Sequence, residues 1–215
     1  MRAWQSIVTG LVVGAAVCAP ALGGIANPPP WQGSGLVGNE VMVRWDFTIL
    51  SNPVGISETW SGPGPAYFSN GPVVFDGSGL LTIPANSTVE IVVPNWPQPN
   101  DFKLVWVQYH IVQGPAIGLD PVIGGSAMNT AGQTILASPW GTPTPVPPGG
   151  GVGGQGLRFP FNPNDELITL TNPNPFPMVL DWLQINTICA PSPGVAVLVG
   201  MGGLVAAGRR RRTSM

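Results

Sequence analysis

The sequence is poor in charged residues, histidine and cysteine, and each shortage excludes a class of function. Only 8% of its 215 residues are charged, and it has one histidine and two cysteines. Metal sites need clustered His, Cys or carboxylate ligands, and nucleophilic catalysis needs a base beside the nucleophile. The composition therefore predicts no catalytic residue, no metal site and no cofactor, and we expect a protein that is not an enzyme.

Basic residues are scarcer still between the two ends of the chain. Five of the eight Lys and Arg residues lie at the ends, which leaves Arg44, Lys103 and Arg158 between them. All ten acidic residues remain there, so the segment 24–190 has a net charge of about −7, from 3 − 10. A nucleic-acid interface needs a basic patch. Nucleic acid is therefore excluded as a partner.

The first 23 residues have the layout of a secretory signal peptide. Arg2 supplies a positive charge, and residues 7–17 form an apolar run. Ala21 and Gly23 are small residues at the third and first positions before a cut, as cleavage requires. We expect export through the secretion translocon and cleavage by signal peptidase before Gly24.

Cysteine usage excludes a disulfide framework. Cys18 lies within the signal peptide, so Cys189 is alone in the segment 24–190. An intrachain bridge needs two cysteines, and none can form there. We expect Cys189 to be a buried thiol at the end of the last strand. Covalent attachment and an intermolecular bridge are the alternatives.

The last 25 residues combine a proline motif, an apolar stretch and a run of arginines. The motif is Pro191, Ser192 and Pro193, the apolar stretch is 195–208, and the run is Arg209, Arg210, Arg211 and Arg212. Arginines hold the end of a segment on the cytoplasmic side of a membrane. A 14-residue helix is ~21 Å long against a hydrocarbon core of ~30 Å, but arginine stems can extend its reach. We expect a membrane helix here; a buried helix of the domain is the alternative.

This tail resembles the PEP-CTERM sorting signal of Gram-negative bacteria, which is also labelled an ice-binding protein C-terminal domain. In that family a Pro-Glu-Pro triplet precedes the apolar segment and the arginines, and Ser192 stands here where Glu is usual. The resemblance implies processing by an exosortase-like enzyme, transient residence in the inner membrane, and delivery to the cell surface or the extracellular matrix. It covers 191–212 and implies nothing about the preceding domain.

The segment 24–190 is one domain with β periodicity. Short apolar or alternating runs, separated by Gly and Pro turns, predict strands at 41–49, 80–83, 89–93, 103–112, 133–137, 157–161, 166–171 and 179–188. This pattern favours an all-β fold, a β-sandwich of jelly-roll type. With the signal peptide and the membrane segment, we expect a helix at each end of the chain.

Residues 138–156 differ from the rest of the domain. They contain five prolines and seven glycines. Each proline removes a hydrogen-bond donor from a β-ladder, so the segment cannot be a central strand. We predict a long, mobile surface loop; a linker between two domains is the alternative.

The predicted strand 103–112 has two unlike faces. One face is apolar, and the other carries Trp106, Gln108 and His110; Trp182 lies in a similar polar register on the last strand. Aromatic rings stack on sugar rings, and amides bind their hydroxyl groups. These four residues are therefore candidate carbohydrate-binding residues. The alternative is that both tryptophans fill the interface between two sheets.

Together these features predict a secreted surface or extracellular-matrix protein with a structural or adhesive role. The alternative function is that of a carbohydrate-binding module that recognises exopolysaccharide. An enzyme acting on exopolysaccharide comes third, because it would need two paired carboxylates in a cleft.

Overall fold

The computed structural model of the chain describes residues 29–31, 39–47, 56–57, 59–75, 78–95, 102–113, 120–163 and 165–190. The predicted signal cleavage site, the proline motif at 191–193 and the arginines at 209–212 lie outside these residues, as do both predicted terminal helices. No helix that could cross a membrane is found in the described part of the chain.

Within the described residues the chain forms β-strands and no helix, which confirms the all-β class. The strands are β1 (Asn39–Trp45), β2 (Thr59–Ser61), β3 (Tyr67–Asn70), β4 (Val74–Phe75), β5 (Leu81–Ile83), β6 (Ser87–Pro94), β7 (Phe102–Gln113), β8 (Val122–Met128), β9 (Thr134–Leu136), β10 (Ser138–Thr144), β11 (Gly151–Phe159), β12 (Asp165–Asn172) and β13 (Met178–Ala190).

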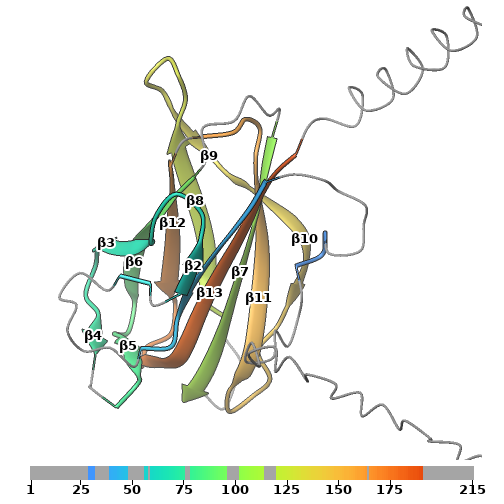
Figure 1. Ribbon diagram of the computed structural model, residues 1–215. Helices are drawn as coiled ribbons and strands as arrows, with labels where there is room; N and C mark the ends of the chain where they lie inside the picture. Colours follow the sequence, from blue (N-terminus) through green and yellow to red (C-terminus); the bar gives the residue numbers. More distant parts are fainter. Residues whose placement is uncertain are drawn as a thin grey trace, which may run out of the picture.

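The strands form two antiparallel sheets in two layers (Figure 1). The eight-stranded sheet has the order β10-β11-β7-β13-β1-β2, with β5 paired to β13 and β4 paired to β5. The five-stranded sheet has the order β3-β6-β12-β8-β9. One buried apolar cluster takes residues from both sheets, so the fold is a β-sandwich.

Alternation along the strands builds the core between the sheets. On β7 the inward residues are Val105, Val107 and Tyr109, and on β13 Leu183 and Ile185 share their layer. The apolar face that the sequence predicted for β7 is thus the face that points inward. Burial of each apolar side chain contributes about 1.5–3 kcal/mol.

The predicted loop at 138–156 is wrong, because this segment holds β10 and most of β11 in an antiparallel hairpin. Pro139 and Pro143 are tolerated because β10 is an edge strand of the sheet. No proline lies within β11, which is a central strand between β10 and β7. The turn is fixed where Val146 N donates to Asp120 Oδ1 at 2.7 Å and Val146 enters the core.

Candidate functional site

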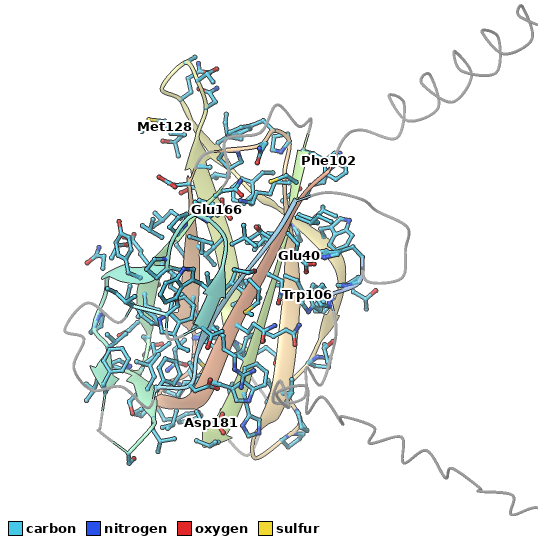
Figure 2. All side chains as sticks on the ribbon, viewed as in Figure 1. Glu40, Phe102, Trp106, Met128, Glu166 and Asp181 are labelled. Carbon is cyan, nitrogen blue, oxygen red and sulfur yellow. The ribbon has the colours of Figure 1, made fainter. Side chains whose placement is uncertain are left out.

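The four candidate residues lie on one surface, the outer face of the eight-stranded sheet. In the pairing of β7 with β13, Trp182 stands opposite His110 and Asn186 opposite Trp106. Gln184 stands opposite Gln108 between these two pairs. The fold thus brings Trp106, Gln108, His110 and Trp182 together on the side of the sheet that faces away from the five-stranded sheet. Trp106 is labelled on this side in Figure 2.

Trp106 is covered on this outer face by other aromatic residues. Its side chain is 2% exposed and packs in a small cluster that is separate from the main core. Trp31 belongs to that cluster, and Trp140 packs against it with 5.9 Å between the centroids of these two rings. Trp31 Nε1 donates to Glu40 Oε1 at 3.4 Å, and this hydrogen bond links Trp31 to β1. Trp31 and Trp140 together form the aromatic cover over Trp106. Trp106 is therefore buried, as the alternative predicted, but it lies on the outer face of the sheet and not in the interface between the two sheets.

Glycines of β11 make room for the Trp106 ring. A Cβ atom on Gly154 would lie 3.1 Å from the ring, and one on Gly156 would lie 3.1 Å from it and 2.2 Å from the Trp140 carbonyl oxygen. The second distance is too short for any side chain. The glycine content that suggested a loop instead permits an aromatic ring to lie against a central strand.

The Gln108 amide is buried on this face. Its exposed fraction is 0%, and neither Nε2 nor Oε1 has a hydrogen-bond partner among the residues that the structure describes. Within the same residues the neighbouring Trp106 Nε1 has none either. By contrast, Gln184 Nε2 donates to Asn186 Oδ1 at 2.7 Å, and Gln184 Oε1 accepts from Arg44 at 3.3 Å. The face thus holds one satisfied and one unsatisfied glutamine side by side.

Trp182 is half-buried between two side chains. The His110 ring is stacked with it at 6.2 Å and 15° between ring planes, and the Arg44 guanidinium lies 4.9 Å from its centroid. Because β13 lies between β7 and β1, these two groups approach the indole from opposite neighbouring strands. His110 Nδ1 also pairs with Asp181 Oδ1 at 2.7 Å, and Arg44 pairs with Asp46 at 2.6 Å. Protein groups therefore already occupy positions where a sugar ring would stack.

A pocket of about 290 Å³ lies elsewhere, between the β8–β9 turn and the residues that precede β12. Its lining combines apolar and polar side chains, namely Met128, Asn129, Thr130, Phe161, Asn162, Pro163 and Asp165. None of the four candidate residues belongs to it. Sequence reasoning missed this pocket because its residues lie in turns and at the ends of β8 and β12, and their placement depends on how the strands pair.

Between the sheets lies an ion pair that the sequence analysis also missed. Lys103 of β7 and Glu166 of β12 are 0% and 1% exposed, and Lys103 Nζ contacts Glu166 Oε2. Burial raises the pKa of Glu166 to about 7, against the opposing effect of Lys103. The sequence did contain a sign of this pair, because Lys103 is two residues from Val105 on β7 and therefore points to the same, inward side of the sheet. An inward lysine in a strand of otherwise apolar inward residues predicts a buried acidic partner.

The Cys189 thiol lies next to this pair. Cys189 stands opposite Lys103 in the pairing of β13 with β7, and its buried side chain forms no disulfide within the described residues. Its Sγ lies 2.9 Å from Asn162 Oδ1, and Asn95 Nδ2 donates to it at 3.3 Å. Burial raises the pKa of this thiol. The expectation of a buried thiol at the end of the last strand is confirmed.

Within the described residues, no three His, Cys, Asp or Glu side chains gather as a metal site would require.

Comparison with known proteins adds little to this geometry. No protein-family model matches the chain, and no curated protein matches it. Among solved structures it is similar to a carbohydrate-binding module, CBM35 from Cellvibrio japonicus Abf62. The two share 10% sequence identity with a TM-score of 0.34, over 68% of this chain and 92% of that chain.

Proposed function

We propose that this is a non-catalytic, structural or adhesive protein of the cell surface or extracellular matrix. One observation supports the structural role above the others: both candidate tryptophans are already engaged by protein groups. Trp106 lies under an aromatic cover, and Trp182 lies between His110 and Arg44. A binding platform would present a free ring face, whereas this surface uses its rings to hold strands and the 29–31 segment together.

Secretion and sorting belong to the same proposal, and the two ends of the sequence support them. The signal peptide would deliver the domain across the inner membrane, and the tail would hold it there until an exosortase-like enzyme acts. The jelly-roll connectivity and the two terminal helices are part of this proposal.

Fractionation of a Gram-negative host that expresses the full chain tests the sorting. The intact chain should reach the surface, where added protease can cleave it, and an exosortase deletion should leave it in the inner membrane. Replacement of Arg209–Arg212 by serine should weaken retention of the precursor, because the arginines hold a short span in place. Unchanged inner-membrane retention of that variant would overturn the charge-stop argument.

Recognition of extracellular polysaccharide is the second candidate function, and the pocket near β12 favours it. The pocket is at the low end of the usual range for small-molecule sites, roughly 300–1,000 Å³, which suits a single sugar unit. Phe161 and Asp165 line the pocket, where an aromatic ring would stack on a sugar and a carboxylate would accept from its hydroxyls. The side chains of Asn129 and Asn162, which also line it, are already hydrogen-bonded to Gln133 and Asn95.

Affinity electrophoresis in gels that contain exopolysaccharide separates the two possible binding surfaces. If the pocket binds sugar, retardation of the chain should be lost in Phe161→Ala and kept in Trp182→Ala. The opposite pattern would favour Trp106, Gln108, His110 and Trp182, whose role as sugar contacts stays a prediction. No retardation of any variant supports the structural role alone.

A further inference from the structure

Lys103 and Glu166 make the most unusual contact between the two layers of the sandwich. One residue is on β7 of the eight-stranded sheet and the other on β12 of the five-stranded sheet, and 63 residues separate them in sequence. Figure 2 places Glu166 in the interior between the layers. The two side chains touch through Lys103 Nζ and Glu166 Oε2. They are the groups needed to form an amide bond.

The surroundings of this contact exclude water. Across its own sheet Lys103 pairs with Phe159 on β11 and Cys189 on β13, and both are 0% exposed. Glu166 pairs with Val93 on β6, which is also 0% exposed. Glu166 Oε1 is buried and has no hydrogen-bond partner in the described part of the chain. A carboxylate in such a place is destabilised relative to its neutral forms.

We propose that Lys103 and Glu166 form an intramolecular amide (isopeptide) bond that links the two sheets covalently. The observation that carries the proposal is a direct, fully buried contact between an amine and a carboxyl group whose second oxygen has no hydrogen-bond partner among the described residues.

The reaction is a condensation without oxidation or reduction. A proton passes from the Lys103 ammonium to the Glu166 carboxylate, which yields a neutral amine and a carboxylic acid. The amine nitrogen then attacks the carboxyl carbon Cδ, an N–C bond forms, and a Cδ–O bond breaks. The departing oxygen leaves as water, taking the acid proton and one amine proton. No co-reactant is needed.

Two physical effects favour this step over the ion pair. Fixing the two groups in contact replaces an encounter in solution by an intramolecular step, for which effective molarities reach ~10⁵–10⁸ M. The product removes two charges from a site where burial penalises them, as the raised pKa of Glu166 shows. Exclusion of water from the site then protects the amide from hydrolysis.

Peptide mapping of the full-length chain by mass spectrometry tests the proposal directly. The folded protein is digested with pepsin, which does not depend on lysine for cleavage. We expect a linked pair of peptides, one with Lys103 and one with Glu166, whose mass is lower than their sum by one water. Lys103→Met and Glu166→Leu should each abolish the pair, while Asp165→Asn, a change at an exposed neighbour, should preserve it.

Two results would overturn the proposal, and neither depends on a variant that folds. One is recovery of both peptides unlinked from the folded wild-type chain. The other is a Lys103 peptide linked to an Asn95 or Asn162 peptide with loss of ammonia, which would assign the bond to an asparagine. Because the measurement is independent of sugar binding and of sorting, its failure leaves the proposed function unaffected.

Discussion

The two faces of the eight-stranded sheet are buried in different ways. The inner face is covered by a second sheet, and its side chains are apolar except at a few positions such as Lys103. The outer face is covered at one end by the aromatic rings of Trp31 and Trp140, and it retains a row of amide side chains. Alternation of residues predicts which side chains share a face, whereas the cover over the outer face depends on segments distant in sequence.

The largest expected effect compares one buried tryptophan from each face. Trp45 is an inner-face residue that is 1% exposed and lies 5.4 Å from the Phe68 ring, centroid to centroid. We expect Trp45→Ala and Trp106→Ala each to lower the free energy of unfolding by ~3–5 kcal/mol, with Trp45 at the upper end because its core is larger. Urea denaturation followed by circular dichroism measures both. A loss below ~1 kcal/mol for Trp106→Ala would show that the outer cover does not stabilise the fold.

A second prediction concerns the charge buried on the inner face. In Lys103→Met no amide can form, and the lysine that lowers the pKa of Glu166 is gone. The folded-state pKa of Glu166, about 7 with lysine present, then lies still further above its unfolded value of ~4.3. The folded state therefore binds the proton more tightly, and stability is fully present below the unfolded pKa.

The free energy of unfolding of Lys103→Met should therefore fall as pH rises from ~4.3 through the folded pKa, by at most ~1.4 kcal/mol per pH unit. Denaturation at pH 5, 6, 7 and 8 measures the slope. The double variant Lys103→Met/Glu166→Leu is the control and should lack this slope, as should a wild-type chain whose carboxyl is consumed in the amide. An equal slope in the double variant would assign the effect to another group.

The third prediction concerns the packing of the outer face, and it compares two glycines of β11. Gly156→Ala should cost ~1–3 kcal/mol, because its Cβ would lie 2.2 Å from a backbone oxygen that cannot move freely. Gly154→Ala should cost less, since its nearest contact is the edge of the Trp106 ring at 3.1 Å. Thermal melts of both variants test the order. Equal melting temperatures would contradict the close approach of β10 to β11.

The fourth prediction, with the smallest expected change in stability, compares Gln108 with the neighbouring Gln184. Gln108→Leu should be neutral or stabilise by up to ~1 kcal/mol, because it removes an amide whose two polar atoms have no hydrogen-bond partner in the described part of the chain. Gln184→Leu should destabilise by ~1–2 kcal/mol, since it removes hydrogen bonds to Asn186 and Arg44. Denaturant midpoints of the pair give the difference. A marked loss in Gln108→Leu would show that this amide is satisfied in solution.

Much of the fold was predictable from local pattern. The eight predicted strands overlap described strands, and β7 and β12 agree within one residue at each end. The sequence analysis did not predict β2, β3, β4, β8 or β10 as strands. β2, β3 and β4 are only two to four residues long, which is too short to show an alternation of apolar and polar residues. In β8 the glycine pair 124–125 interrupts that alternation.

The sequence could predict which residues of the candidate site share a face, but it could not predict which residues cover them. The parity of Trp106, Gln108 and His110 placed them on one face, and antiparallel pairing brought Trp182 beside them. Their cover could not be predicted, because it comes from Trp31 and Trp140, which are 75 and 34 residues from Trp106 in sequence. The same limit applies to Lys103, whose partner lies on a strand of the other sheet.

We propose that the rings of the outer face are engaged by the protein itself and do not form a ligand platform. Trp182 is a better test of this proposal than Trp106, because its half-buried ring is the less covered of the two. We would measure the retardation of the wild-type chain and Trp182→Ala in gels containing exopolysaccharide, with thermal melts of both. We expect equal retardation of the two chains and a lower melting temperature for the variant. Loss of retardation with an unchanged melting temperature would instead show that Trp182 contacts the polymer.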